Sequence, residues 1–444
     1  MFGIIALILV FITFILCVKD NTYGLIIFLV TRILIPETVR LPGGIISLNT
    51  AVIMVLLSFT VLRIIKRNGR VKFNIGFIFA VCIFLIYSVI ALIISDYGNI
   101  STQFNSLIKF FITDLLPPLL FVINIKKFSQ VKKIIKAFVI ISIICCSYGI
   151  ISTLIGKNYY LLYVNQVFGA DVYIRNTNSW FGSETAGTFV STNSFGYYIS
   201  LSIPFLMYIR SKSISVKESN IAIGLLCVCA ILCKKRTTFL VVLLYFLILF
   251  LSGDFKKRIK IVLLSLIPLS VFVTAIFMLP SFSLMKSFIL SSTFFWNDSL
   301  YRNLAGNQTG STWELRMRQF IYPYLEIKNN LLFGHGYGWC GWYLSEYKLH
   351  PIMYGFETIL SQLVCDFGLM GYIVYFLVML NSGRFACDGR KIKNKYIMLF
   401  IVSSIVLMIG TGAVYWYLFL VMIILMHYCE FEMHIYEKGI VLKE

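Results

Sequence analysis

The feature that most constrains the fold of this chain is a succession of long apolar runs that repeats from one end to the other. A transmembrane helix needs about 20 mostly apolar residues to cross about 30 Å of hydrocarbon. Of the residues, 59% are hydrophobic and only 13% are charged, whereas soluble domains carry about 25% charged residues. The core of a soluble domain does not explain this pattern, so we expect an integral membrane protein.

The candidate spans are continuous rather than alternating, which favours helices over a β-barrel. They are 2–18, 23–36, 45–62, 74–95, 105–124, 137–155, 193–209, 220–233, 237–252, 261–279, 357–380 and 397–428. Gly410 and Gly412 interrupt the last stretch, which is expected to form one span or two short ones. The sequence therefore predicts an all-α polytopic membrane protein with about 11–13 transmembrane helices. We expect residues 1–444 to form a single membrane domain.

Lysine and arginine gather in short segments between the apolar runs. These segments are 63–72, 126–136, 210–217, 256–260 and 384–395. By the positive-inside rule they lie in the cytoplasm. Segments 96–104, 156–192 and 280–356 are then extracytoplasmic, and 280–356 is a large loop before the last two or three spans. The net charge of +20 comes from these clusters. It does not indicate nucleic-acid binding, because no basic stripe with interleaved aromatics accompanies it.

The Lys234-Lys235-Arg236 segment departs from this alternation. The order of the spans puts it at the outer end of a short hairpin, although it holds three cations. One interpretation is that the span count is off and that the segment is cytoplasmic. The other is that an outward-facing cation at the membrane boundary binds an anionic ligand.

Three arginines are candidates for such a role. Arg236, Arg316 and Arg318 lie in segments predicted to face outward. The planar guanidinium can donate two hydrogen bonds to phosphate oxygens, which favours arginine at phosphate sites. For Arg318, a solvated surface position is the simpler interpretation.

His350 and Glu357 are the candidate general bases for a transfer to a hydroxyl group. A single histidine is often structural. Glu357 opens the apolar run 357–380, where a carboxylate could instead stabilise the N-terminus of a helix. The residues alone leave both assignments open.

Further candidates for substrate contact lie in the two outer loops. The 156–192 loop and its border mix aromatic and amide side chains with Arg175, Glu184 and Asn193, a composition that suits carbohydrate. His335 lies between Gly334 and Gly336. These glycines are expected to make a tight turn rather than a phosphate loop, because no Lys-Ser/Thr ending follows. No DxD pair or CxxC pair occurs, so we predict neither a metal site nor a cofactor.

Three motifs together resemble the O-antigen polymerase/ligase family of bacterial membrane glycosyltransferases. They are Gly187-Thr-Phe189-Val-Ser-Thr-Asn193, Lys235-Arg236-Thr237-Thr238, and Arg316 followed by Gly334-His-Gly336-x-Gly338 and Gly368-Leu-Met-Gly371. The likeness covers roughly residues 180–380.

The resemblance implies an inverting, metal-independent enzyme of the bacterial cytoplasmic membrane with an extracytoplasmic active site. Its substrate would be an undecaprenyl-diphosphate-linked oligosaccharide, and its partners membrane lipid and the chain-length regulator and flippase of the same pathway. Arg236 and Arg316 would hold the diphosphate. Two positions depart from the family pattern. Glu184 stands where a basic residue is expected, which Arg175 could replace. Glu357 stands where a histidine is expected, with His350 seven residues earlier.

The leading hypothesis is therefore a polysaccharide polymerase that joins lipid-linked repeat units. A ligase that transfers the glycan to lipid A core is the alternative within the same enzyme class, and the two differ in their acceptor. A lipid-linked oligosaccharide flippase or other transporter is the alternative from another class. That hypothesis predicts repeated halves, charges within spans and no large outer lobe.

Overall fold

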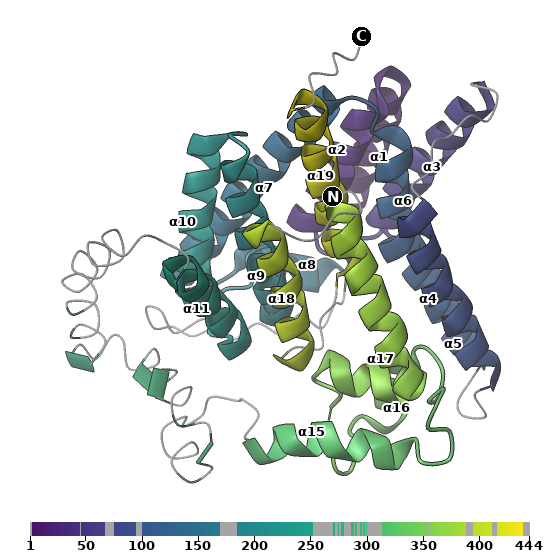
Figure 1. Ribbon diagram of the computed structural model, residues 1–444, viewed down its shortest axis with the longest axis vertical. Coiled ribbons are helices and arrows are strands. Elements are labelled where there is room, and N and C mark those ends of the chain that lie inside the picture. The colour runs from purple at the N-terminus through teal and green to yellow at the C-terminus, as the bar shows by residue number, and fades with distance from the viewer. Residues whose placement is uncertain are drawn as a thin grey trace.

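The computed structural model describes residues 2–44, 46–66, 75–94, 100–168, 184–251, 313–353, 355–387, 394–410 and 415–437, together with scattered positions between 270 and 299. The described chain is a bundle of helices (Figure 1). They are α1 (Phe2–Lys19), α2 (Asn21–Leu34), α3 (Leu48–Lys66), α4 (Ile75–Ile94), α5 (Ile100–Phe110), the π-helical turn η1 (Phe111–Leu115), α6 (Leu116–Asn124), α7 (Phe128–Ile155), α8 (Tyr159–Phe168), α9 (Thr192–Ser211), α10 (Val216–Leu232), α11 (Arg236–Leu251), α15 (Trp313–Glu326), α16 (Trp339–Tyr347), α17 (Ile359–Ala386), α18 (Lys395–Gly410) and α19 (Trp416–Glu437).

The fold is all-α, as expected, and its apolar helices are those of a membrane protein. Among the described residues, 4 helices are long and apolar enough to span a membrane: Leu48–Lys66, Ile100–Asn124, Phe128–Ile155 and Ile359–Ala386. Shorter apolar helices accompany them, including α2, α18 and α19. The 397–428 stretch forms two helices. The predicted span 261–279 lies almost entirely outside the described residues.

One predicted boundary is wrong. Segment 126–136 is not a loop, because α7 begins at Phe128 and runs for 28 residues. The Gln130 side chain accepts hydrogen bonds from the backbone N–H groups of Lys126 and Lys127, which fixes the start of the helix. Three of the segment's lysines, Lys132, Lys133 and Lys136, are on the first turns of this helix, where their long stems let the charged heads reach solvent.

The described parts of the basic segments lie at one end of the bundle, which we call the basic end, whereas segment 256–260 lies outside the described residues. The basic end carries Lys19, Arg63, Lys66, Lys126, Lys127, Lys132, Lys133, Lys136, Arg210, Lys212, Lys217 and Arg384. Side-chain contacts join its helix ends: Gln130 donates to Thr22 at 2.8 Å, and Arg63 donates to the Cys17 carbonyl at 2.9 Å. Glu430 of α19 lies 2.9 Å from the Lys212 ammonium. This clustering agrees with the positive-inside pattern read from the sequence.

The opposite end carries the described parts of the segments that were predicted to face outward. There α2 and α7 end and α9, α11 and α17 begin. Helices α15 and α16 lie at the α17 start, far from the C-terminus (Figure 1). They belong to the predicted 280–356 loop, whose described part thus contains two helices joined by turns. We call α15, α16 and the segment between them the lobe.

Two glycines attach the lobe to α17. Gly368 has φ 67° and ψ −165°, which breaks the helix and exposes its backbone to the 331–335 segment. Leu369 N donates to the Leu331 carbonyl at 3.0 Å, and His335 N donates to the Cys365 carbonyl at 2.8 Å. A Cβ on Gly334 would lie 2.6 Å from the Gly368 nitrogen. The glycine motif therefore allows close backbone packing.

Replacing Gly368 by alanine is expected to detach the lobe. Its Cβ would lie 2.5 Å from the Leu332 carbonyl carbon, at a backbone angle that side chains rarely adopt, and we expect a loss of about 2 kcal/mol or more in stability. Gly341→Ala is the control, because nothing lies within 4 Å of its added Cβ. Limited proteolysis of the purified variants measures the effect. Equal protection of the 313–350 region in both would contradict this account.

Candidate functional site

Arg316 and Glu357 form an accessible ion pair between the lobe and the start of α17. The Arg316 Nη2 lies 3.4 Å from the Glu357 Oε2, and the two side chains are 27% and 50% exposed. Arg316 Nη1 also donates to Gln319 Oε1 at 3.1 Å. Buried Gln319 in turn donates to the Gly355 carbonyl at 3.2 Å. The guanidinium is thus held in place but remains within reach of a bound anion.

The structure also tests whether Glu357 caps the N-terminus of α17. Capping of α17 is carried out by the next residue, because the Thr358 side chain accepts a hydrogen bond from Ser361 N at 3.0 Å. Thr358 is buried, whereas the Glu357 carboxylate faces Arg316. Glu357 is therefore not the residue that caps this helix.

His350 has both ring nitrogens engaged and is buried. Its Nδ1 accepts hydrogen bonds from the backbone N–H groups of Ile352 and Met353, at 3.2 and 3.1 Å. This places the proton on Nε2, which lies 3.3 Å from the Glu326 carboxylate. With the Nδ1 lone pair occupied, His350 holds the 350–353 turn against α15 and has no basic nitrogen directed to a substrate.

Arg318 and His335 also have evident structural contacts. Arg318 pairs with Glu314 one turn away on the exposed side of α15. His335 is buried, with its ring 4.4 Å from the Trp339 ring and its carbonyl accepting from Gln103 Nε2 at 3.0 Å. Burial lowers the pKa of His335, while the Glu326 carboxylate acts in the opposite direction. His335 thus packs the lobe onto α5.

A second cluster joins the two other sequence motifs. Glu184 Oε2 lies 3.1 Å from the Lys235 ammonium and 3.3 Å from Thr192 Oγ1. Half-buried Arg236 follows as the first residue of α11, and exposed Asn193 lies in the first turn of α9. Glu184, which stands where the resemblance predicts a basic residue, thus forms an ion pair with Lys235. Arg175 lies outside the described residues.

A third cluster was not predicted from the sequence. Arg32 is 5% exposed near the end of α2. Its Nη1 lies 3.0 Å from Glu37 Oε1, and its Nη2 lies 3.9 Å from Asp114 Oδ1. The guanidinium carbon lies 4.0 Å from the centroid of the Tyr417 ring. Glu37 is 48% exposed, so this buried network opens to the surface on one side.

Asp114 owes its position to a local change of helix geometry. It lies in η1, where the backbone widens to a π-turn before Pro117 and Pro118. A proline nitrogen cannot donate to the carbonyl four residues earlier, and its ring displaces that carbonyl. Such π-turns occur frequently at functional sites. The available signal was the charged residues inside two predicted spans, Arg32 in 23–36 and Lys109 and Asp114 in 105–124, because ionisable residues within spans are usually functional.

Aromatic contacts connect the three clusters across the opposite end. On one side, the Tyr415 ring lies 5.7 Å from Tyr417 and 6.1 Å from Phe189, next to the Glu184 cluster. On the other side, the Tyr337 ring of the lobe segment lies 5.2 Å from Phe110, one turn before Asp114. The Arg32 network therefore lies between the Arg236 region and the lobe.

Among the described residues, no group of three or more histidine, cysteine or acidic side chains has the arrangement of a metal site. The described side chains at this end include arginine, lysine and carboxylate groups, together with histidine, amide and tyrosine side chains. Such a set can bind an anion and accept a proton.

Comparisons with protein-family models, with curated proteins and with solved structures found no match to this chain.

Proposed function

We propose that this chain is a polysaccharide polymerase that joins undecaprenyl-diphosphate-linked repeat units by inverting, metal-independent glycosyl transfer. The observation that carries the proposal is the accessible Arg316–Glu357 pair at the end of the bundle opposite the basic end. With the basic end in the cytoplasm, this pair faces the side where assembled lipid-linked glycans are used.

The pair combines the two groups that such a transfer requires. A cation must stabilise the charge that develops on the departing diphosphate, and a base, here a carboxylate, must accept the proton of the attacking hydroxyl. In the structure the two groups are engaged with each other at 3.4 Å. A diphosphate carries more charge than one carboxylate, so its binding would draw Arg316 away and leave Glu357 as a proton acceptor.

The bonding changes of the proposed step balance without a cofactor. The acceptor hydroxyl oxygen attacks the anomeric carbon of the donor from the face opposite the diphosphate, and a glycosidic bond forms. The bond between this carbon and the diphosphate oxygen breaks, and its electron pair leaves with undecaprenyl diphosphate. The hydroxyl proton moves to Glu357. Attack from the opposite face inverts the configuration at the anomeric carbon.

The other two clusters would hold the remaining parts of the substrates. Arg236 and Lys235 supply positive charge at the start of α11, and exposed Asn193 supplies an amide for sugar hydroxyls. Buried Arg32, held by Glu37 and near Asp114, would add a fixed guanidinium between these residues and the lobe. Charges fixed in a site of low polarity stabilise a developing anion more strongly than mobile surface charges.

One observation favours transport as a second candidate. Arg32 and Asp114 are ionisable residues within apolar helices, and such residues also mark substrate pathways in transporters. The lobe distinguishes the candidates, because Arg316 on α15 and Glu357 just before α17 lie at the bundle end rather than at its centre.

Deletion of the gene followed by analysis of cell-surface glycans separates the candidate functions. A polymerase is expected to leave acceptors capped by a single repeat unit. Accumulated lipid-linked polymer would instead indicate a ligase. Loss of every outward-facing repeat unit would indicate a flippase and would contradict the proposal.

The two candidate bases are expected to behave differently. Glu357→Gln should reduce polymer formation by about 100-fold or more, because the amide cannot accept the proton. His350→Asn should retain most of the activity, since its role is to hold the 350–353 turn. Polymer length and amount in complemented deletion cells measure both effects. A severe loss with His350→Asn at normal protein level, together with normal activity of Glu357→Gln, would reverse the assignment.

A further inference from the structure

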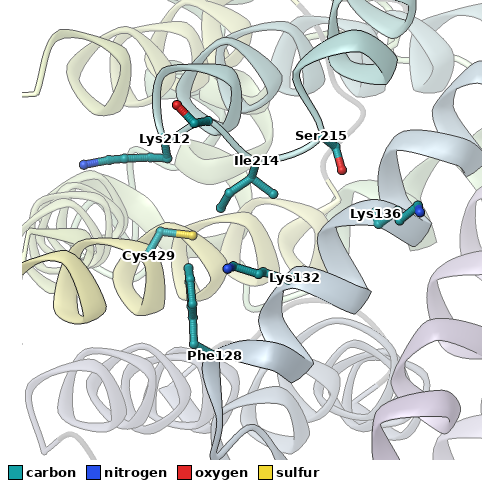
Figure 2. A pocket seen from close by; sticks show the side chains of 8 residues that line it. Phe128, Lys132, Lys136, Lys212, Ile214, Ser215 and Cys429 are labelled. Atoms are coloured by element: carbon teal, nitrogen blue, oxygen red, sulfur yellow. The ribbon is translucent and has the colours of Figure 1, made fainter. Parts of the chain in front are cut away.

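A cavity of about 340 Å³ lies at the basic end, away from the residues of the proposed reaction. It is lined by Phe128, Lys132, Lys136, Lys212, Ser213, Ile214, Ser215 and Cys429. Figure 2 shows the α7 side chains on one side, the turn between α9 and α10 on the other, and Cys429 of α19 beside them. Three separate parts of the chain thus enclose a small space rimmed by lysines.

The charges around this cavity leave a positive excess. Lys212 is neutralised by Glu430 at 2.9 Å. The same oxygen, Glu430 Oε1, also accepts hydrogen bonds from Tyr208 at 3.1 Å and Asn394 at 3.0 Å, so Glu430 is held beside Lys212. Lys132 and Lys136 are exposed, and the Lys132 ammonium lies 4.8 Å from the centroid of the Phe128 ring. Lys132 and Lys136 are therefore the two lysines at this cavity that are available to bind an anion.

The turn opposite these lysines suits the same kind of ligand. Ser213 and Ser215 have φ of 58° and 45°, a conformation that costs about 1–3 kcal/mol each outside glycine. Ser215 precedes α10 but makes no side-chain cap hydrogen bond, and it is one of the residues that line the cavity. The positive end of the α10 dipole thus adds to the lysine charges.

An apolar strip continues from the lysines toward the middle of the bundle. Residues four apart lie on one face of a helix, so Lys132, Lys136, Ile140 and Ile144 form a single line along α7. Ile140 and Ile144 are 43% and 50% exposed. Ile221, six residues after Ser215 on α10, is 55% exposed. A ligand with an anionic head and an apolar tail fits this order of charge and apolar surface.

We propose that this cavity binds the phosphodiester headgroup of an anionic lipid, with an acyl chain along Ile140 and Ile144. Lys132 and Lys136 contact the phosphate oxygens, and the Ser215 hydroxyl donates a hydrogen bond from the opposite wall. Lysine clusters between helices at the membrane surface are suited to such headgroups. The assignment is independent of the proposed function, because the cavity shares no residue with the proposed reaction site.

Native mass spectrometry of the detergent-solubilised full chain tests the assignment, with phosphatidylglycerol titrated against phosphatidylcholine. The wild-type chain is expected to retain phosphatidylglycerol selectively. Lys132→Gln/Lys136→Gln should bind it about 30-fold more weakly, since each cation near a membrane surface contributes about fivefold. Lys133→Gln is the matched control, because Lys133 is an exposed lysine of the same helix that does not line the cavity.

A second arm identifies the source of the phosphate. Inorganic phosphate at millimolar concentration should not displace the lipid; displacement at that concentration would show that a soluble anion occupies the cavity instead. Lys132→Arg/Lys136→Arg keeps the charge and is expected to retain binding, which separates loss of the site from loss of the fold. Equal phosphatidylglycerol binding by the wild-type chain, the double glutamine variant and Lys133→Gln would overturn the assignment.

Discussion

Replacing Arg316 by alanine is expected to abolish polymer formation while leaving the protein in the membrane. We expect a loss of about 100- to 1,000-fold, the range seen when one group that stabilises a developing anion is removed. The reason is that Arg316 is the accessible guanidinium directed at Glu357, at 3.4 Å. Incorporation of labelled repeat units into polymer, normalised to protein amount, measures the effect.

Arg318→Ala is the matched control for this variant. Arg318 is on the same helix two residues later, and it pairs with Glu314 on the exposed side. Exposed pairs of this kind contribute about 0–1 kcal/mol, so Arg318→Ala should polymerise nearly normally. A wild-type polymer ladder from Arg316→Ala, or an equal loss in both variants, would remove Arg316 from the proposed site.

Replacing Arg32 by methionine is expected to have the second large effect, mainly on stability. Arg32 is 5% exposed and offsets the Asp114 charge inside the bundle. Removing one partner of a buried ion pair costs about 3–5 kcal/mol, because the other charge is left uncompensated. We therefore expect low protein levels and a marked fall in the unfolding temperature of the detergent-solubilised variant.

The double variant Arg32→Met/Asp114→Asn distinguishes a structural role from a functional one. It removes both buried charges, which is often neutral for stability, and should restore most of the unfolding temperature. If the Arg32 network contributes to catalysis, the restored protein should still polymerise poorly. Restored stability together with normal polymer formation would show that the network serves the fold alone.

The helical architecture was largely predictable because apolar runs of membrane length leave few alternatives. The start of α7 was not predictable in the same way. The segment with Lys132 and Lys136 was predicted to be a loop, because lysine indicates solvent exposure. Lysine is also a good helix former, and these residues lie in α7. The break of α17 at Gly368 was also missed, because it depends on the approach of the distant 331–335 segment.

The candidate site was predicted in part. Sequence analysis singled out Arg316 and Glu357, and the structure brings these two together. It left His350 open as a base, because the hydrogen bonds that occupy Nδ1 come from a turn that spacing alone does not reveal. Arg32 and Asp114 were not predicted to meet, because they lie 82 positions apart in the sequence and come together only through the packing of α2 against α6.

The central claim is that this chain itself forms glycosidic bonds. The most direct measurement mixes the purified full chain in detergent with an undecaprenyl-diphosphate-linked repeat unit and follows both polymer length and released undecaprenyl diphosphate. The account predicts a ladder of products, with one undecaprenyl diphosphate released for each new bond, and no ladder from Arg316→Ala or Glu357→Gln. Unchanged substrate in detergent, together with movement of the same lipid across reconstituted vesicles, would contradict it.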